Sequence, residues 1–359
     1  ILFNKLHNYG IRGQPLSLIK SYLSERSQYC MIGNTQSSSI ETPPYGVPQG
    51  SVLGPLLFLI YINDIKNATN TTSIIQYADD TTLYCSGPDP AVLRNNIITD
   101  LTRLDSYFSS NSLQLNLTKT NYMILKPKNP RINTDIDTHI TILNTDIHQV
   151  NETSFLGVII DDKLSFHSHI KKTENKVSSG LYALRSVKHL LPKQHLKLIY
   201  HALISSHLTY GITLWHAAPT KHLHKLTVLQ KKAIRIITGS PYNAPSKPLF
   251  KTERILPLDK LYSFELKKLM YKINHNLLPT HIPDIFSENH SSYHTPHAYM
   301  TRYRRTNPMP TQTNRHHLSH KSFVQKGPQM WNELPPEIKN INTIKKFSHR
   351  IKSIIFQQL

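Results

Sequence analysis

The sequence predicts an α+β fold, and the change of its apolar periodicity along the chain is the main reason. Up to about residue 160, short runs of β-forming residues alternate with helical patterns, whereas after Asp161–Asp162 apolar residues recur at helical spacing. The 359 residues suffice for two or three domains with apolar cores. We expect three regions: an α+β region over residues 1–160, a helical region over 161–240, and a small basic region with helices over 241–359.

Helices and strands alternate in the first region. Two short helices are expected within residues 1–26, one after the loop that begins at Gly46, and one over 91–109. Ser51 is a good N-cap for the helix at about 56–62, which is apolar on every side and is therefore expected to be buried all round. Strands are predicted over residues 28–32, 40–45, 74–77, 81–85, 113–117, 122–125, 140–150 and 155–160.

The remaining regions have helical patterns. Helices are predicted over residues 170–191, 193–208 and 220–238, and Gly239 is positioned to end the last of these. Residues 289–320 are rich in Pro, His and Asn, and a further helix is predicted over 344–355.

Positive charge is concentrated in the second part of the chain. The net charge is +20, from 42 Lys and Arg against 22 Asp and Glu. Residues 1–160 contain 11 basic and 12 acidic residues, whereas residues 161–359 contain 31 and 10. A generally basic surface would also give this excess, but the asymmetry favours a polyanion such as nucleic acid as the partner.

Composition excludes several classes of protein. The two cysteines, Cys30 and Cys85, cannot build a disulfide framework or a Cys-rich zinc module, and the histidines without nearby cysteines predict no structural zinc site. The longest apolar run, Val52 to Ile62, is about half the ~20 residues of a membrane-spanning helix. The start of the sequence shows no signal peptide and resembles the middle of a gene. We expect an intracellular protein that does not enter a membrane.

Two adjacent carboxylates are the first candidate for chemistry. Tyr77-Ala78-Asp79-Asp80 forms a small acidic turn between two apolar β-forming runs. Paired carboxylates are ligands for Mg²⁺, and two such ions would stabilise the entering and leaving oxygens of a phosphoryl transfer. On these four residues alone, an acidic hairpin turn in water is the simpler interpretation.

A glycine- and proline-rich loop is the second candidate. Gly46-Val47-Pro48-Gln49-Gly50-Ser51 precedes an apolar helix, and its glycines allow a ligand to approach the backbone near the free N–H groups of that helix. Gln49 has a side chain that can bind a base or a sugar. An ordinary strand-to-helix turn would have the same composition.

Together these segments resemble the reverse transcriptases of non-LTR retrotransposons, of the jockey-like and chicken-repeat-like lineages. The resemblance lies in the order and separation of Gly46 to Phe58, Tyr61-Ile62-Asn63-Asp64-Ile65 and Tyr77-Ala78-Asp79-Asp80-Thr81. Less specific similarity follows at residues 115–120, 155–161 and 331–335. The resemblance implies a partial right-hand polymerase palm, an antiparallel sheet with helices, over 1–160, an all-helical thumb over 161–240 and a small helical C-terminal region.

The resemblance also implies a role for individual residues. Asp79 and Asp80 would be catalytic and bind Mg²⁺, and Lys119 would approach the triphosphate and protonate the leaving pyrophosphate, although a solvated lysine is an equal interpretation. Leu156 and Gly157 would hold the primer; the alternative for Gly157 is a β-bulge. The implied partners are an RNA template, a DNA primer and deoxynucleoside triphosphates. The residues implied in nucleotide and template binding are Gly46, Pro48, Gln49, Gly50, Tyr77 and Ala78.

The predicted helices of the basic half have one apolar stripe and one basic face. Ile170, Val177, Leu181 and Leu184 are expected to pack, and Ile234, Ile236 and Ile237 do the same in a later helix. The opposite faces are expected to contact nucleic-acid phosphates rather than only water. The residues concerned are Lys171, Lys172, Lys176, Arg185, Lys188, Lys231, Lys232 and Arg235.

One departure from the family pattern limits the expected activity. The family has another metal-binding carboxylate upstream of the block that begins at Ile1, and no residue here matches it. We therefore expect a fragment truncated before that carboxylate and without polymerase activity alone. The alternatives are a non-catalytic nucleic-acid-binding remnant or scaffold, and a reverse transcriptase of another lineage. The family acts in the nucleus, but no dense basic import signal is present.

Overall fold

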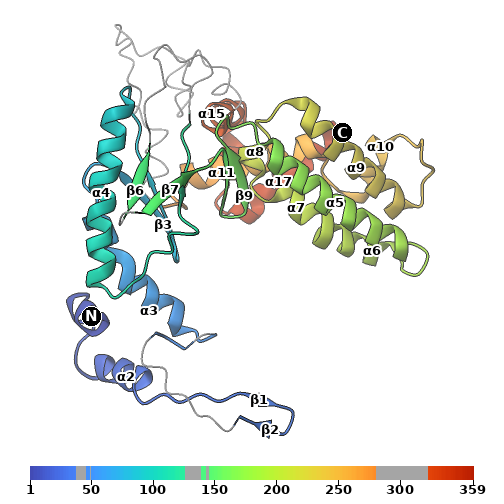
Figure 1. Ribbon diagram of the computed structural model, residues 1–359. Coiled ribbons are helices and arrows are strands. Elements are labelled where there is room, and N and C mark those ends of the chain that lie inside the picture. Colours follow the sequence, from blue (N-terminus) through green and yellow to red (C-terminus); the bar gives the residue numbers. More distant parts are fainter. Residues whose placement is uncertain (38–45, 49, 126–138, 143–144, 280–321) are drawn as a thin grey trace. The chain divides into compact units, whose positions relative to one another are not determined.

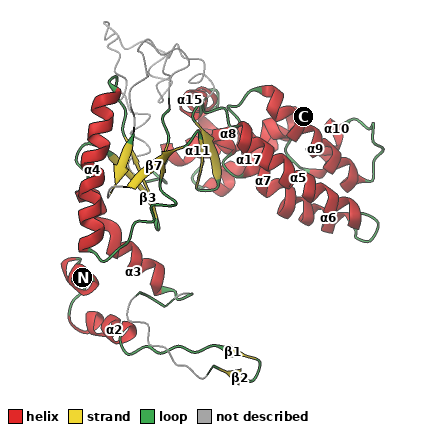
Figure 2. Cartoon of the chain, in the orientation of Figure 1, coloured by secondary structure: helices red, strands yellow, loops and turns green. Residues whose placement is uncertain are grey.

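A computed structural model describes residues 1–37, 46–48, 50–125, 139–142, 145–279 and 322–359 (Figure 1). The chain divides into two compact units, Ile1–Val150 and Asn151–Leu359, which we call unit 1 and unit 2. Helices and small sheets make up the described residues, so the predicted α+β class is confirmed (Figure 2). The boundary precedes residues 155–160, which the sequence assigned to the first region, and the division into three regions stays a prediction.

Unit 1 is organised around one long helix, α4 (Pro90–Ser110). The side chain of Asp89 caps it by accepting the Ala91 N–H at 2.8 Å, and Pro90 occupies a first-turn position where a missing N–H is harmless. This helix confirms the prediction for residues 91–109. The other helices of the unit are α1 (Leu2–Asn8), α2 (Gly13–Leu23), α3 (Leu53–Ile62) and the short 3₁₀ helix η1 (Asn63–Ala68).

The strands of unit 1 are short. β3 and β4 form an antiparallel hairpin, as predicted for residues 74–85, and β5 pairs in parallel with β7, which also pairs antiparallel with β6. β1 and β2 form a small ribbon of their own. The bounds are β1 (Met31–Ile32), β2 (Thr35–Gln36), β3 (Ser73–Tyr77), β4 (Asp80–Tyr84), β5 (Asn121–Tyr122), β6 (Ile140–Ile142) and β7 (Thr145–Gln149).

Three predictions for unit 1 need correction. Residues 113–117 alternate between half-buried and exposed side chains like a strand, but within the described part of the chain no strand pairs with them. Thr35–Gln36, for which no strand was predicted, is strand β2, while residues 40–45 lie outside the described part. Helix α3 is not buried all round, because Leu53, Leu56 and Leu59 are 41%, 53% and 47% exposed.

Two small apolar clusters hold unit 1 together. The first joins the C-terminal part of α3 to the β3–β4 hairpin and α4 through Ile62, Ile65 and Leu104, with Ile74 and Leu83 packed against them. The second places β6 and β7 against α4. Its buried members are Ile140, Ile142 and Ile147, and Ile97, Leu101, Leu115, Leu117 and Tyr122 pack around them.

Unit 2 begins with a hairpin and continues as helices. β8 (Glu152–Phe155) pairs antiparallel with β9 (Val158–Asp161). Helix α9 covers the residues predicted for it and ends at Gly239, whose φ of +63° is the left-handed conformation of a helix stop. The first group of helices is α5 (His167–Val187), α6 (Lys193–Tyr200), the π-helical turn η2 (His201–Ser205), α7 (Ser206–Thr209), α8 (Ile212–Trp215) and α9 (Thr220–Thr238). The second group is α10 (Ser246–Glu253), α11 (Leu258–Asn274), α15 (Phe323–Asn332), α16 (Pro336–Lys339) and α17 (Ile344–Gln358).

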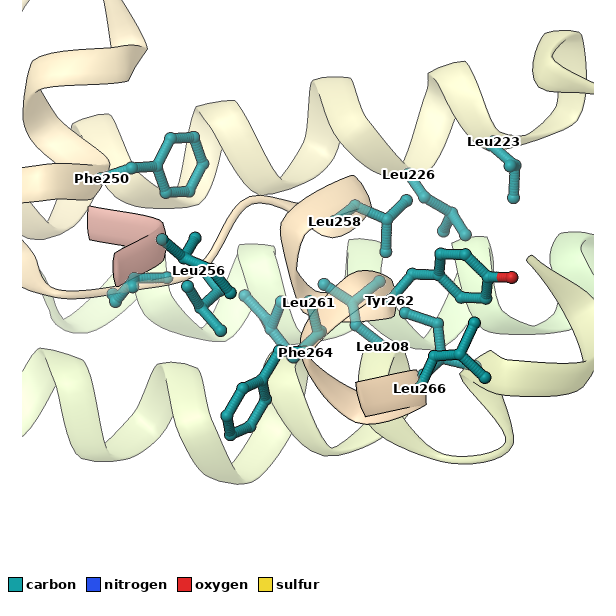
Figure 3. Packing of buried hydrophobic residues seen from close by; sticks show 14 of the residues in the cluster. Leu208, Leu223, Leu226, Phe250, Leu256, Leu258, Leu261, Tyr262, Phe264 and Leu266 are labelled. Carbon is teal, nitrogen blue, oxygen red and sulfur yellow. The ribbon is translucent and has the colours of Figure 1, made fainter. Parts of the chain in front are cut away.

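One continuous apolar core fills unit 2. It runs from Ile170 on α5 to Ile355 on α17, and Figure 3 shows the part where Leu208, Leu226 and Leu266 converge. An aromatic group of Tyr271, Trp331 and Phe347 joins α11, α15 and α17 within it. The predicted apolar stripe of α5 and the residues Ile234 and Ile237 of α9 are buried, as expected.

Candidate functional site

The turn between β3 and β4 places Asp79 and Asp80 at the surface of unit 1. Tyr77 pairs with Asp80, so Ala78 and Asp79 form a two-residue turn, and Ala78 has a φ of +52°. A positive φ at the first central residue suits a tight hairpin but is strained for a residue other than glycine. Both aspartates are exposed, and neither makes an ion pair with a described residue.

A buried carboxylate on α4 holds the start of this hairpin. Asp100 is completely buried and accepts the N–H groups of Thr71 and Thr72 at 2.9 and 2.8 Å and that of Asn70 at 3.1 Å. Its Oδ2 also accepts both threonine hydroxyls at 2.9 Å. Burial opposes ionisation, but these donors outweigh it and keep the pKa of Asp100 well below its usual range. Asp100 therefore fixes the segment that leads into β3.

The glycine-rich loop is connected to the hairpin through α3. The hydroxyl of Ser51 donates to the Pro48 carbonyl at 2.7 Å and accepts the Gly54 N–H at 3.0 Å, so Ser51 contacts the first turn of α3, although Val52 and not Ser51 is the N-cap residue. A Cβ on Gly54 would lie 2.8 Å from Ser51 Oγ, so this close approach requires glycine. Gly46 and Gly50 have φ of +89° and +76°, and Gln49 lies outside the described residues.

The block Tyr61 to Ile65 has a structural contact that its sequence did not reveal. Lys5 Nζ donates to the Tyr61 carbonyl at 2.6 Å and to Asp64 Oδ1 at 2.8 Å, and the hydroxyl of Tyr107 also donates to Asp64 Oδ1. Burial raises the pKa of Asp64, but the hydrogen bonds from Lys5 and Tyr107 exceed this effect and lower it overall. The network ties α1, η1 and α4 together beside the hairpin.

Lys119 lies in a turn that is held to α4 by the second apolar cluster. Its N–H donates to the Asn116 carbonyl at 3.1 Å, and its side chain is exposed without an ion pair to a described residue. Leu115 and Leu117 anchor this turn. The structure thus holds the acidic hairpin and the Lys119 turn against α4, whereas the glycine-rich loop is connected to α4 through α3. Among the described residues, no hydrogen bond or ion pair joins their proposed functional side chains.

The carboxylate pair fits a divalent cation in its donor chemistry. Mg²⁺ is usually held by one or two carboxylates together with water and substrate phosphates, and Asp79 and Asp80 supply two unpaired carboxylates at an exposed turn. Within the described ranges, no group of three or more His, Cys, Asp or Glu gathers at a possible metal site. These two residues therefore fit part of the ligand set of such an ion.

In unit 2, Leu156 and Gly157 form the turn of the β8–β9 hairpin. Phe155 pairs with Val158, and the two residues between them have φ of +46° and +82°. Gly157 is therefore the second central residue of a two-residue turn with two positive φ values, and not the β-bulge considered as the alternative. Asp161 closes the following loop by accepting the N–H groups of Ser165 and Phe166 at 3.0 and 2.7 Å.

The basic residues of α5 and α9 differ in their exposure. Those of α5 lie on the face opposite its buried apolar stripe and are exposed, whereas Lys231, Lys232 and Arg235 on α9 are half-buried. Arg235 Nε donates to the Ala244 carbonyl at 2.9 Å, which is a structural contact. The face of α5 has a shallow depression of about 460 Å³, lined by Ser168, Lys171, Lys172, Asn175, Lys176 and Ser179.

Sequence reasoning did not identify Asp100 or Tyr210, although both hold candidate elements. Asp100 lies at helical spacing from Ile97 and Leu104, so an acid on the core-facing side of α4 was a usable signal. Tyr210, which contacts the Leu156–Gly157 turn, is far from it in the sequence and offered no such signal.

Comparison with known proteins shows which proteins the chain resembles. Residues 1–160 match the family model of reverse transcriptase (RNA-dependent DNA polymerase). The chain is 24% identical over 270 residues to the RNA-directed DNA polymerase from mobile element jockey of Drosophila melanogaster, covering 72% of this chain and 28% of that protein. It is 29% identical over 237 residues to the probable RNA-directed DNA polymerase from transposon BS of the same species, covering 63% and 26%. The jockey polymerase of Drosophila funebris is 28% identical over 238 residues, covering 64% and 25%.

The acidic hairpin and the loop before α3 lie in the region that matches the reverse transcriptase family model. The relatives are polymerases of mobile elements, and the chain is similar to them and, over residues 1–160, to the reverse transcriptase family. It spans about a quarter of the length of the curated relatives it matches. No solved structure matches the chain. In the described residues, no helix is long and apolar enough to cross a membrane.

Proposed function

We propose that this chain carries part of the catalytic apparatus of an RNA-directed DNA polymerase, in which a primer 3′-hydroxyl attacks a deoxynucleoside triphosphate and pyrophosphate leaves. The single observation that carries the proposal is the exposed Asp79–Asp80 turn, free of ion pairs to described residues, inside a region that matches the reverse transcriptase family. In this proposal residues 1–160 contain the palm elements, the helices within residues 161–240 act as the thumb, and residues 241–359 form a basic C-terminal region.

Each candidate residue has a defined part in the proposed reaction. Asp79 and Asp80 would hold Mg²⁺, which supplies Lewis-acid stabilisation of the reacting phosphate in a two-metal mechanism. Lys119 has an exposed ammonium that can donate a proton to the leaving pyrophosphate. Tyr77, Ala78 and the loop of Gly46, Pro48, Gln49 and Gly50 would position the template base and the nucleotide.

The parts of unit 2 are proposed to hold the template–primer. Leu156 and Gly157 would contact the primer end, and the lysines of α5 would contact phosphates of the RNA or DNA backbone. The exposed basic face of α5 also favours a second candidate function, a nucleic-acid-binding scaffold without catalysis, because phosphate contacts need no metal site.

Iron-directed cleavage tests the metal site without requiring polymerase activity. Fe²⁺ bound in place of Mg²⁺ produces hydroxyl radicals with ascorbate and peroxide, and these cut the polypeptide near the ion. We expect cleavage of the chain close to residue 79, suppressed by excess Mg²⁺ and lost in the variant Asp79→Asn/Asp80→Asn.

The matched control replaces Asp105, an acidic residue on α4 without an ion pair to a described residue. Asp105→Asn should keep the wild-type cleavage pattern. Cleavage that is absent from the hairpin, or that persists there in the double variant, would reject the metal site and favour the scaffold, whose nucleic-acid binding would be unchanged in the same variant.

A further inference from the structure

The turn proposed to hold the primer is itself held by a residue from a distant helix corner. The hydroxyl of Tyr210 donates a hydrogen bond to the carbonyl of Leu156, which is the first central residue of the β8–β9 turn. The Tyr210 ring lies so close to Gly157 that a Cβ there would be 3.4 Å from its Cε1. One side chain therefore contacts both residues of the turn.

The backbone of Tyr210 is fixed in turn. Tyr210 ends α7, and the next residue, Gly211, has a φ of +62° before α8 begins. The indole N–H of Trp215 donates to the Tyr210 carbonyl at 2.8 Å, and Trp215 is completely buried. The buried core of unit 2 thus sets the position from which the Tyr210 side chain reaches the turn.

Two further contacts support the same docking. A Cβ on Gly211 would lie 3.0 Å from Val158 Cγ2, so the corner meets strand β9 at a distance that only glycine allows without adjustment. His169 Nδ1 on α5 accepts the Ile159 N–H at 3.3 Å, and its ring is 6.0 Å from that of Trp215. The strands are therefore held at β9 as well, but Tyr210 alone of these groups contacts the turn.

The exposure of the contact matters for function. Tyr210 is 56% exposed although its hydroxyl is hydrogen-bonded, so it contributes little to the apolar core. Its position beside an exposed turn is suited to holding a loop in one conformation for a ligand. Leu156 has a φ of +46°, a conformation that is strained for leucine, so the contacts around the turn must hold it.

We infer that Tyr210 is a positioning residue, whose hydroxyl fixes the Leu156–Gly157 turn in the conformation that receives the 3′ end of a primer. This inference rests on the proposed function of the turn. Tyr210 acts through the Leu156 carbonyl and takes no part in the bond-forming step.

The first measurement concerns the turn alone. Hydrogen–deuterium exchange of the free chain is compared for wild type, Tyr210→Phe and the control Tyr242→Phe, which changes a tyrosine that is 80% exposed. Loss of one hydrogen bond should speed exchange of the amides of residues 156–159 by about fivefold in Tyr210→Phe, with helix α9 and the control unchanged. Equal exchange in wild type and Tyr210→Phe would overturn the inference at this step.

The second measurement concerns the primer end. A template–primer carries 2-aminopurine as the 3′-terminal primer base, which reports its local environment, and a dye at the far end, whose anisotropy reports affinity. We expect the affinity of Tyr210→Phe for the template–primer to lie within about twofold of wild type, because the basic face of α5 is intact. The change in 2-aminopurine fluorescence on binding should fall to half of the wild-type change or less. If the 2-aminopurine fluorescence changes as much with Tyr210→Phe as with wild type, the positioning role is overturned even if hydrogen exchange is faster.

The wild-type response separates this inference from the proposed function. Salt-dependent binding without any 2-aminopurine change would overturn the role of the turn, and with it that of Tyr210, while leaving phosphate binding by α5 in place. No binding of the template–primer would overturn both. Tyr242→Phe is expected to equal wild type in both signals.

Discussion

Unit 1 and unit 2 are stabilised in different ways. Unit 1 has two small apolar clusters and depends on polar anchors, chiefly Asp100 and the Lys5–Asp64 pair, to define the loops around its acidic hairpin. Unit 2 has one continuous apolar core, beside which buried polar side chains such as Gln230 and Glu253 also lie. The catalytic residues are proposed to lie in unit 1, where directional hydrogen bonds specify the geometry of the loops. The nucleic-acid contacts of α5 are proposed for unit 2, which has the large core.

Charge follows the same division. Residues 1–150 contain 11 basic and 11 acidic residues, whereas residues 151–359 contain 31 and 11. A unit with a net charge of +20 repels itself, and a large apolar core offsets that repulsion. The near-neutral unit does not face this cost, so small clusters and hydrogen bonds suffice for it. We therefore expect the two units to respond separately to substitution.

Replacement of Trp331 should have the largest effect, and only on unit 2. Trp331 is 2% exposed and packs with Tyr271 and Phe347, so Trp331→Ala removes a large buried ring and is expected to cost about 4 kcal/mol of unfolding free energy. Urea unfolding followed by the fluorescence of Trp215 measures this, since both tryptophans lie in unit 2. Trp331→Phe is the control and should cost less than half as much.

The comparison would fail if Trp331→Ala changed the two units equally. Hydrogen exchange along the β3–β4 hairpin reports unit 1 in the same samples. Exchange there should match wild type under conditions in which α11 and α17 have become unprotected.

Replacement of Asp100 should affect unit 1 by a smaller amount. Asp100→Asn removes a carboxylate that accepts five hydrogen bonds and leaves buried donors without an acceptor, at a cost of about 3 kcal/mol. The exchange of the β3–β4 amides should rise, while the fluorescence midpoint of unit 2 stays unchanged. A shift of the fluorescence midpoint instead would show that the two units unfold together.

The pH dependence of the same variant sharpens this test. The pKa of Asp100 is lower in the folded than in the unfolded chain, so its stabilisation is present above about pH 4 and is lost as the pH falls toward the folded pKa. Wild-type unit 1 should therefore lose stability below about pH 4 more steeply than Asp100→Asn. Parallel pH profiles of the two proteins would contradict the assignment.

Neutralising the basic face of α5 should have the smallest effect, which is a loss of binding free energy for nucleic acid. It should not change the folding of the chain. Lys171, Lys172 and Lys176 are exposed, so their replacement by Gln should leave the unfolding curve unchanged. Template–primer affinity should fall on the order of tenfold at low salt, and the slope of log affinity against log salt should decrease by about 3. Lys247, Lys251 and Arg254, exposed on and after α10, form the control set, and an equal loss in that variant would mean that only total charge matters.

The outcome for α4 and for residues 113–117 shows where sequence patterns suffice and where they do not. α4 was predictable because Asp89, Pro90 and the apolar spacing act within one segment, and each favours the same helix. Residues 113–117 show the alternation of a strand, but Leu113 joins one apolar cluster and Leu115 and Leu117 another, and no described strand pairs with them. The pattern indicates which side chains are buried. It does not indicate strand pairing, because pairing depends on segments that are distant in the sequence.

The candidate site divides in the same manner. The acidic hairpin and the loop before α3 were recognisable because their geometry follows from adjacent residues, such as the tight Tyr77–Asp80 pairing. The contacts that hold these elements, from Asp100 to Thr72 and from Lys5 to Asp64, join residues 28 and 59 positions apart. A lone Asp or Lys in a sequence has no marker for a partner at such a distance.

By itself, the sequence determined the α+β class, the helices α4 and α9, the acidic hairpin, the asymmetry of charge and the resemblance to a polymerase family. Only the tertiary structure decided that Asp100 anchors the hairpin, that one face of α3 is exposed, and that Tyr210 contacts the turn of Leu156 and Gly157. The physical reason is that periodicity, caps and turns depend on neighbours along the chain. Buried hydrogen bonds and packing depend on which segments the fold brings together.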